Sequence, residues 1–448
     1  GMSGIAEVLN NLGYEVSGSD IQSNDATKRL EGMGCSISYK QHGDNVIGKQ
    51  AVVVSSAIGS NNAELQEAKK QKLLVVPRAE MLAELMRFRF GIAVAGAHGK
   101  TTTTSLIVHI LSEAKLDPTY IIGGIINATG MNAKLGKSDY LVAEADESDA
   151  SFLHLKPMLS VITNIDEDHM ATYKHNYNNL TKAFINFTSN LPFYGVCVAC
   201  IDDQGVQDIL SKIHRPILSY GFSEDADVKA SNVVQNKMKM NFDVDCQSFQ
   251  KKFPVTLNLI GKHNILNALA AISIALELEI KPKLIQKALA NFSGVSRRLD
   301  YHQTITVNKK TVPLFDDYGH HPNEIAAVLS TLRNTYPTNR LVVIFQPHRF
   351  SRTRDMFNEF VSCLSKAGVL ILLDIYSANE KPIKQITSSV LANSIRQRSS
   401  IDPIVVNDST EIVDILPNII HKNDVILTLG AGDVNKIPHQ LKEYFTSS

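Results

Sequence analysis

Short, continuous apolar runs rich in Val and Ile recur along the whole chain, and most are followed by a turn and a helical stretch. Continuous rather than alternating apolar runs are typical of strands that are covered on both faces. Strands that alternate with helices predict an α/β fold with mostly parallel sheets. The expected strands are Glu15–Ser19, Ala51–Ser55, Leu73–Val76, Ile92–Ala95, Tyr140–Ala143, Leu159–Thr163, Val196–Ile201, Leu341–Phe345, Val369–Asp374, Ile404–Val406 and Val425–Leu429.

The length of 448 residues is enough for about three domains. We place the junctions near residue 90 and near residue 295, which gives domains 1–90, 91–295 and 296–448. Residues 222–256 are polar and alternating, so we expect an antiparallel excursion there. The chain opens directly on a helical segment, Ser3–Leu12, with no strand before it.

Composition excludes several classes of protein. Lys and Arg total 45 and Asp and Glu total 45, so the chain lacks the global field of a general nucleic-acid binder. The most apolar stretch, Ile265–Leu276, is shorter than the roughly 18 residues of a membrane span and predicts a buried helix. We expect no signal peptide. Sparse cysteines suit a reducing cytoplasm, and the lone pair Cys197 and Cys200 is interpreted as part of a buried strand.

The most specific local pattern follows the strand Ile92–Ala95, where Gly-Ala-His-Gly-Lys-Thr leads into a helix. Glycine allows the tight turn that points backbone N–H groups at phosphate oxygens, and a helix N-terminus adds further donors. The lysine reaches β- and γ-phosphates and the threonine hydroxyl can ligate Mg²⁺. Val94 stands where a full Walker loop has its first glycine, so this is a shortened loop. The predicted nucleotide-binding residues are Gly96, Ala97, His98, Gly99, Lys100, Thr101 and Thr102.

Two further strands end in acidic groups. The strand at Tyr140 runs into Glu144–Asp149, and the strand at Leu159 runs into carboxylates and His169. Ligands gather at the carboxyl ends of parallel strands, and Mg²⁺ takes oxygen ligands, so these segments predict a magnesium site beside the phosphate loop. The alternative is helix capping and solvated loops.

Two polar clusters lie in the last third of the chain. Leu314–Pro322 ends in Asp-Asp-Tyr-Gly-His-His-Pro, and Phe345–Arg354 carries Arg349 and Arg352 three residues apart. Arginines at that spacing on a helix can hold one carboxylate or phosphate; the alternative is a solvated basic turn. A zinc site at the two histidines is disfavoured, because no further ligand has the spacing.

Taken in order, these motifs resemble the Mur ligases of peptidoglycan synthesis. The resemblance implies a Rossmann-like N-terminal domain for a UDP-sugar, apparently lacking its first strand and Gly-rich run, a central P-loop ATPase, and a Rossmann-like C-terminal domain for an amino acid. The segments that carry it are residues 1–20, HGKTTTT (98–104), EADESDASFLHL (144–155), TNIDEDHMATY (163–173), GKHNILNA (261–268), RRLD (297–300), DDYGHHP (316–322) and QPHRFSRTRD (346–355).

The resemblance also implies a reaction. ATP phosphorylates the carboxylate of UDP-N-acetylmuramate, and the amine of L-alanine attacks the acyl phosphate to give an amide. By position, the resemblance implies Lys100 for the phosphates; Thr101, Glu144 and His169 for Mg²⁺; Asn264 and Asn267 for adenine; Arg298 for phosphate; Asp317 for ribose or a hinge; Tyr318, His320, Arg349 and Arg352 for the amino acid; and Ser55 and Ser56 for the UDP-sugar.

Some alternatives stay open on sequence grounds. On spacing alone, helix capping is the preferred interpretation of Asn264 and Asn267. Ala97 stands where relatives often have Thr, a change that backbone cradling tolerates. A ligase that recycles a whole tripeptide shares the ATPase core, and a nucleotide-binding module without ligase turnover would share the loop.

Overall fold

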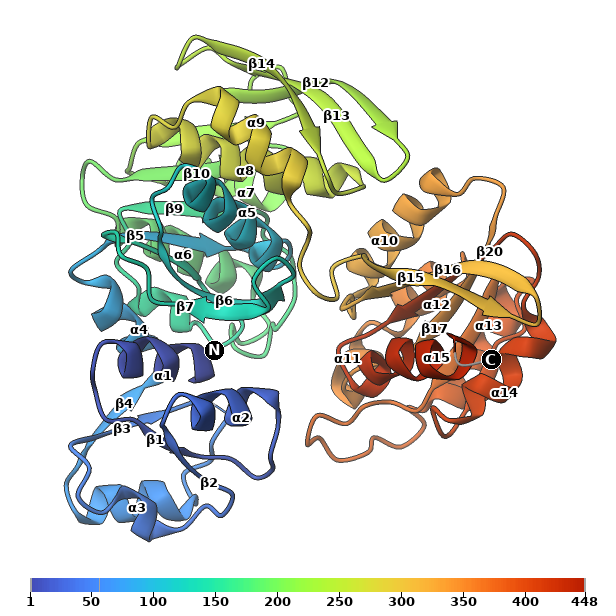
Figure 1. Cartoon of the computed structure of the whole chain (residues 1–448), viewed down its shortest axis with the longest axis horizontal. Helices are drawn as coiled ribbons and strands as arrows, with labels where there is room; N and C mark the ends of the chain where they lie inside the picture. The colour runs from blue at the N-terminus through green and yellow to red at the C-terminus, as the bar shows by residue number, and fades with distance from the viewer. Residues whose placement is uncertain (1, 56, 447–448) are drawn as a thin grey trace. The chain divides into compact units, whose positions relative to one another are not determined.

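The computed structural model describes residues 2–55 and 57–446, and the chain forms two compact units (Figure 1). The first contains residues 1–259 and 263–293, and the second contains residues 260–262 and 294–448. Each unit is described by itself. Over the described residues, the helices fall short of the length and apolarity that crossing a bilayer requires.

The first unit is built on a mostly parallel sheet with the strand order β14-β13-β12-β11-β10-β9-β5-β8-β6-β7. In this order, the seven strands from β12 across to β6 pair in parallel with one another. Strand β7 adds an antiparallel edge beside β6, and β13 and β14 add antiparallel strands beside β12. The strands are β5 Phe90–Ala95, β6 Thr119–Ile126, β7 Met131–Lys134, β8 Tyr140–Glu144, β9 Leu159–Ile162, β10 Val196–Cys200, β11 Ile217–Gly221, β12 Val228–Asn236, β13 Lys239–Cys246 and β14 Lys251–Leu257.

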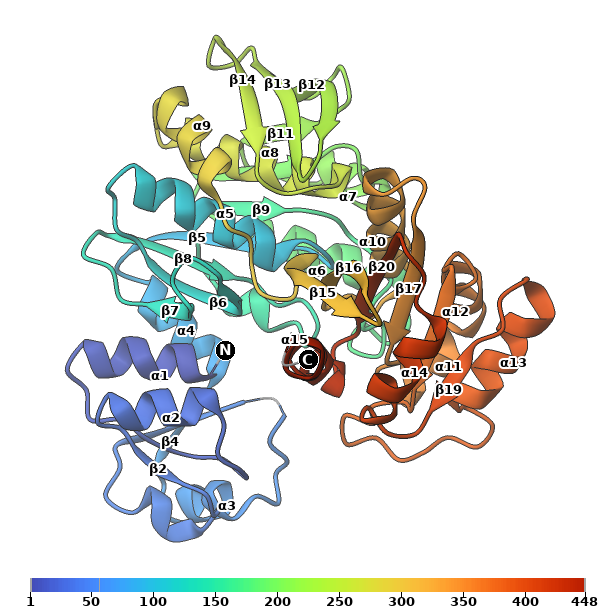
Figure 2. The ribbon, with the colours of Figure 1, turned by 45° about the vertical axis from the view of Figure 1, so that its right-hand side comes forward.

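Helices cover this sheet, as its continuous apolar strands require. The central strand β5 is buried from Gly91 to Ala95, and α8 is buried along most of its length. Figure 2 shows β12, β13 and β14 extending beyond the parallel part as a meander, which confirms the expected antiparallel excursion. The helices are α4 Arg78–Met86, α5 Lys100–Glu113, η2 Ser151–His154, α6 Tyr177–Ser189, α7 Gln204–Leu210, α8 Lys262–Glu277 and α9 Pro282–Asn291.

The amino-terminal part of the first unit contains two separate pairs of short parallel strands, β1 with β2 and β3 with β4. Over the described residues these pairs are not joined into one sheet. The first helix packs on β7 of the central sheet, and Gly4 lies so close that an added Cβ would be 2.9 Å from the Ala133 Cβ. The elements are α1 Met2–Asn11, β1 Ser17–Ser19, α2 Asp25–Gly32, β2 Ser36–Ser38, η1 Gly43–Val46, β3 Ala51–Val54, α3 Ala63–Lys70 and β4 Leu74–Pro77.

The second unit contains a sheet with the order β15-β16-β20-β17-β18-β19, in which all pairings except β15 with β16 are parallel. Its strands β17, β18 and β20 are almost completely buried. The elements are β15 Asp300–Val307, β16 Lys310–Asp317, α10 Pro322–Thr335, β17 Arg340–Phe345, α11 Phe350–Asp355, α12 Phe357–Leu364, β18 Val369–Leu373, α13 Ser388–Arg398, β19 Ile404–Val406, α14 Glu411–Ile419, β20 Asp424–Leu429, η3 Asp433–Lys436 and α15 Ile437–Thr446.

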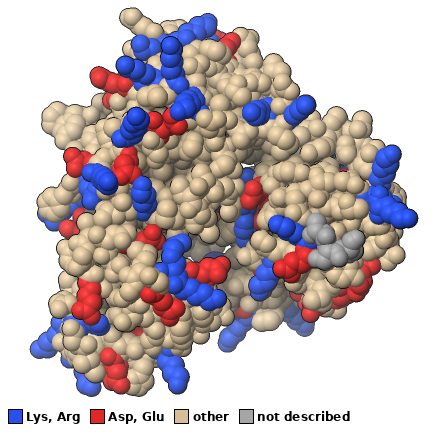
Figure 3. Space-filling model, viewed as in Figure 1, with Lys and Arg blue, Asp and Glu red and all other residues tan. Residues whose placement is uncertain are grey.

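The surface and the cysteines agree with the composition. Acidic and basic side chains are mixed over the face drawn in Figure 3. All five cysteines lie in the described part of the chain as free, buried thiols. Cys197 and Cys200 belong to β10, and burial raises the pKa of each thiol to about 12. They are strand residues rather than a redox pair, as expected.

Candidate functional site

The loops of the first unit that carry the candidate functional residues follow three neighbouring strands. Strand β5 lies between β8 and β9, with Val94 opposite Glu144 and Ala95 opposite Ile162. The pairs are parallel, so all three strands end at the same edge of the sheet. The phosphate loop therefore emerges between the Glu144–Asp149 segment and the Thr163–His169 segment, which confirms the shared edge expected from the sequence.

The phosphate loop is held in shape by the end of β9. The Asn164 side-chain amide accepts a hydrogen bond from the His98 N–H at 2.8 Å and donates one to the His98 carbonyl at 2.9 Å. The Thr163 hydroxyl donates to the same carbonyl at 2.7 Å, and the Ala97 N–H donates to the Asn164 carbonyl at 3.3 Å. A Cβ on Gly96 would lie 2.0 Å from the Thr163 hydroxyl oxygen, so only glycine allows this approach.

These contacts divide the predicted phosphate-binding residues into two groups. Ala97 and His98 turn their N–H groups toward Asn164. Helix α5 then begins at Lys100, after Gly99 in the left-handed conformation with φ of 81°. The first N–H groups of a helix have no partner within it, and they carry the positive end of its dipole. Lys100, Thr101 and Thr102 therefore supply the donors best suited to phosphate oxygens.

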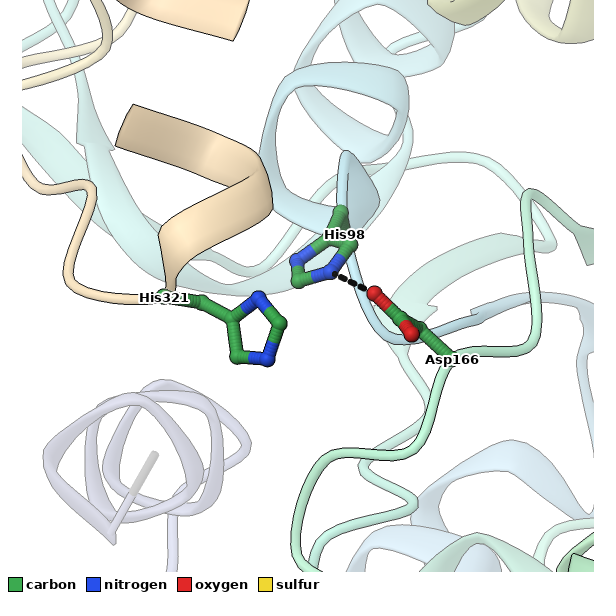
Figure 4. A group of neighbouring side chains, drawn as sticks. All are labelled: His98, Asp166 and His321. Carbon is green, nitrogen blue, oxygen red and sulfur yellow. Dashed lines mark hydrogen bonds and ion pairs between the residues drawn. The ribbon is translucent and has the colours of Figure 1, made fainter. Parts of the chain in front are cut away.

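Figure 4 shows the His98 ring directed at Asp166, with 3.0 Å between its Nε2 and the Asp166 Oδ2. Both side chains are partly buried, at 21% and 29% exposure. His98 thus contacts the loop after β9 through its backbone and through its ring.

Lys100 is the cation of the loop, and its donors are all in use. Its Nζ donates to the Gly96 carbonyl at 2.6 Å, to the Ala97 carbonyl at 3.1 Å and to the Glu147 carboxylate at 2.8 Å. Burial disfavours the charge on Lys100, but the carboxylates of Glu147, Asp146 and Glu144 outweigh burial and raise its pKa. Lys100 is therefore an ammonium ion at neutral pH.

The predicted magnesium ligands Thr101 and Glu144 lie at this edge, with Thr101 buried in the first turn of α5. The Glu144 Oε1 accepts a hydrogen bond from the Gly123 N–H at 2.8 Å, which fixes the carboxylate. Hydroxyl and carboxylate oxygens are donors that Mg²⁺ prefers. His169 follows β9 in the left-handed conformation, with its Nε2 3.5 Å from the Asp168 carboxylate.

Asn264 and Asn267 are buried in the first turns of α8, and Asn267 contacts the phosphate loop. Its Oδ1 accepts a hydrogen bond from the Thr103 hydroxyl at 3.2 Å, and its Nδ2 donates to the Asn264 Oδ1 at 3.1 Å. A Cβ on Gly99 would lie 2.4 Å from the Asn267 Oδ1. Asn267 therefore ties α8 to the start of α5, and the adenine contact stays a prediction.

In the second unit, the Asp317 carboxylate holds the backbone just before strand β15 and just after strand β16. One carboxylate oxygen accepts the Leu299 N–H at 2.6 Å and the other accepts the Gly319 N–H at 2.7 Å. Burial raises the pKa of Asp317 to about 7, against the opposing charge of Arg298. Arg298 lies over the Tyr318 ring at 5.1 Å, with Glu324 3.9 Å away. The backbone contacts favour the hinge interpretation of Asp317.

The four residues predicted to bind the amino acid follow strands β16 and β17. The Tyr318 and His320 rings are 5.3 Å apart, and the His320 ring is 5.7 Å from that of His348. Arg352 is buried, and Arg349 directly precedes α11 as its N-cap residue, with φ of 71° and ψ of 135°. Burial first, and then the neighbouring His320, Arg352 and Arg349, lowers the pKa of His348 to about 4. His348 therefore has basic side chains among its neighbours.

The remaining substrate predictions fall in the amino-terminal part. Ser55 follows β3, and its hydroxyl accepts a hydrogen bond from the Ala57 N–H at 3.3 Å. Ser56 lies outside the described residues.

Several residues that shape these sites were not predicted. Thr163, Asn164, Glu147 and His348 lie inside recognised motifs, so their sequence neighbourhood was a signal, although their contacts were not. Gly123 and Tyr376 had no local signal. Tyr376 stacks on His348 with rings 5.3 Å apart, and its carbonyl accepts the Arg349 N–H at 2.8 Å.

Comparison with known protein families gives matches across the chain. The Mur ligase family catalytic domain matches residues 1–90, the Mur ligase middle domain matches residues 94–275, and the Mur ligase glutamate ligase domain matches residues 297–432.

Full-length relatives are also similar. The UDP-N-acetylmuramate–L-alanine ligase of Vesicomyosocius okutanii is 64% identical over 446 residues, which cover 100% of this chain and 95% of the relative. The ligase of the same name from Hydrogenovibrio crunogenus is 51% identical, covering 99% and 96%. The crystal structure of UDP-N-acetylmuramate-alanine ligase from Thermotoga maritima superimposes with a TM-score of 0.83 at 25% identity, covering 100% of this chain and 96% of that one.

Proposed function

Because this chain belongs to the Mur ligase family, we propose that it joins L-alanine to the carboxylate of UDP-N-acetylmuramate, with ATP as the energy source, in the synthesis of peptidoglycan precursors. The observation that carries the proposal is the edge of the first unit's sheet. A phosphate loop emerges there between two acidic segments, in a chain that matches alanine-adding ligases over its full length.

The proposed division of labour follows the three matched regions. We infer a UDP-sugar-binding domain over residues 1–90 with Ser55 and Ser56 near the substrate, an ATP-binding domain over 91–295, and an amino-acid-binding domain over 296–448. A cytoplasmic location suits the free thiols of all five cysteines, which lie in the described residues.

The phosphate-transfer step needs charge neutralisation more than covalent chemistry. Lys100 and the N–H groups of Lys100, Thr101 and Thr102 hold the phosphates of ATP. Asn264 and Asn267 contact the adenine, and Arg298 contacts the transferred phosphate. Bound Mg²⁺, held by Thr101, Glu144 and His169, would lower the repulsion between ATP and the sugar carboxylate.

The amide-forming step needs an oriented amine. Arg349 and Arg352 hold the carboxylate of L-alanine through charge-assisted hydrogen bonds. The rings of Tyr318, His320 and His348 follow one another in contact, and His348 stays neutral at neutral pH because its pKa is about 4. A carboxylate fixed by two guanidinium groups leaves the amine free to attack the acyl phosphate.

The test is an ADP-release assay with UDP-N-acetylmuramate and, in turn, L-alanine, glycine, L-serine and the recycling tripeptide as acceptor. We expect turnover with L-alanine to exceed turnover with the tripeptide by orders of magnitude. Lys100→Ala should remove turnover while leaving the circular dichroism spectrum unchanged. Preference for the tripeptide would favour the recycling ligase, and ADP release that ignores both acceptor and UDP-sugar would favour a nucleotide-binding module.

A further inference from the structure

The pair formed by Lys100 and Glu147 has no role in the chemistry described above. It is the most buried ion pair beside the phosphate loop, with the Lys100 side chain 17% exposed and the Glu147 side chain 5% exposed. Burying two charges is expensive unless geometry and further hydrogen bonds compensate. A buried pair in the centre of a binding loop therefore requires an explanation.

The geometry of Lys100 supplies the first part of that explanation. An ammonium group has three donors, and here they are directed at the Gly96 carbonyl, the Ala97 carbonyl and the Glu147 carboxylate. Each acceptor belongs to the protein. A phosphate oxygen can gain a short hydrogen bond from Lys100 only if one of these three bonds is released.

Glu147 is the acceptor that differs from the other two, since it is the anion. Its backbone is held by two hydroxyl groups. The Tyr173 hydroxyl donates to the Glu147 carbonyl, and the Thr172 hydroxyl donates to the Ser148 carbonyl at 2.6 Å. The segment is thus tied to the loop after β9, independently of Lys100. The backbone of Glu147 is therefore fixed by contacts that do not involve Lys100.

We propose that Glu147 is a positioning residue that holds Lys100 inside the phosphate loop when no nucleotide is bound, and that the triphosphate of ATP binds by displacing the Glu147 carboxylate from the Lys100 ammonium. The inference rests on the proposed function, because it takes Lys100 as a phosphate ligand. Glu147 is then a competitor of the nucleotide, and the affinity for ATP is lower than the loop alone would give.

The test is Glu147→Gln, which keeps the shape and a hydrogen-bonding oxygen but removes the competing charge. Dissociation constants for ATP with Mg²⁺ are measured by titration calorimetry without the other substrates. Relief of competition should tighten ATP binding by about tenfold, because a hydrogen bond from the Lys100 ammonium to a carboxylate is stronger than one to a neutral amide and is harder to release. Unchanged or weaker binding by a folded Glu147→Gln protein would overturn the inference.

Glu7→Gln is the matched control. Glu7 is also a buried acid in an ion pair, with its carboxylate 3.2 Å from the Arg29 Nε, in the amino-terminal part of the same unit. Its removal should lower the melting temperature without changing the ATP dissociation constant. An equal gain in affinity in Glu7→Gln would mean a general effect of buried charge and would refute a specific role for Glu147.

The double variant Lys100→Ala, Glu147→Gln separates a role through Lys100 from direct repulsion of phosphate. If Glu147 acts by holding the lysine, the gain from Glu147→Gln disappears once Lys100 is absent. A gain that persists would overturn the positioning role. If Glu147→Gln does not fold, Glu147→Asp, with a carboxylate one methylene shorter, should show a smaller gain in the same direction, and no gain would count against the inference.

The outcomes also distinguish this inference from the proposed function. A wild-type chain that binds no ATP with Mg²⁺ would overturn both. A wild-type chain that binds and turns over, with no gain in Glu147→Gln, would overturn the inference alone.

Discussion

The contact between Asn164 and His98 gives the sharpest test of how the phosphate loop is built. Asn164→Ala removes one hydrogen bond to the His98 N–H and one to the His98 carbonyl. The carbonyl keeps the Thr163 hydroxyl as a partner, but the N–H loses the Asn164 side chain as its acceptor. Losing one of the two hydrogen bonds to the His98 carbonyl costs about 1 kcal/mol, and removing the acceptor of the His98 N–H costs about 1–3 kcal/mol.

The total loss of about 2–4 kcal/mol destabilises the conformation of the loop more than it destabilises the whole fold. If most of it must be supplied by bound ATP to restore the loop, the dissociation constant for ATP rises by about tenfold to several hundredfold, because 1.4 kcal/mol is tenfold. Calorimetric titration with ATP and Mg²⁺ measures this directly.

Asn190→Ala is the control, since the Asn190 side chain also makes two hydrogen bonds with the backbone, donating to the Leu153 carbonyl at 2.8 Å and to the Leu155 carbonyl at 3.1 Å. Both variants should lower the melting temperature by a few degrees. Only Asn164→Ala should weaken ATP binding. Equal ATP affinity in the two variants would refute the reasoning that Asn164 sets the shape of the nucleotide site.

Three further outcomes are expected. Gly123→Ala places a Cβ 2.9 Å from the Glu144 Oε2, so the Mg²⁺ concentration for half-maximal activity should rise several-fold, whereas Gly32→Ala, with open space at its Cβ, should leave it unchanged. Arg352→Lys loses the forked donor and should raise KM for L-alanine by about tenfold or more while KM for ATP stays within about twofold; parallel increases would contradict the pocket assignment. Burial raises the pKa of Asp317 from 3.8 to about 7, so the folded state binds its proton more tightly than the unfolded state and this contribution to stability is lost as pH rises from about 4 to about 7. Asp317→Asn should therefore flatten the fall in melting temperature over that range, and an unchanged slope would exclude Asp317 as its source.

The sequence predicted the sheet best where strands are buried on both faces. The β5 and β17 segments are continuous apolar runs, and their positions match within two residues. Strand β6 was missed because its Gly123-Gly124 pair is typical of a turn, and β16 was missed because Lys310–Pro313 is polar. Both strands are defined by pairing with distant segments, which local patterns do not contain.

The same difference applies to the site. The position of the phosphate loop beside the acidic segments could be predicted, because these segments follow strands and parallel strands end at one edge of the sheet; the binding roles of Glu144 and His169 stay predictions. Asn164 and Glu147 could not be predicted, because their importance lies in contacts with His98 and Lys100 that exist only once β5 has paired with β8 and β9. Residues expected to contact a ligand are therefore easier to predict from local sequence than residues that hold those ligand-binding residues in position.

Arg349 has a backbone conformation, with φ of 71° and ψ of 135°, that lowers the stability of the fold, whereas its side chain is the one proposed to recognise the amino acid. Side chains with a Cβ are strained in this region, typically by about 1–3 kcal/mol, and glycine is not. A glycine would make the turn into α11 easier to form, yet it would delete the guanidinium on which the proposed capture of alanine depends. Selection for heat resistance alone would therefore favour a sturdier chain that no longer recognises its amino acid.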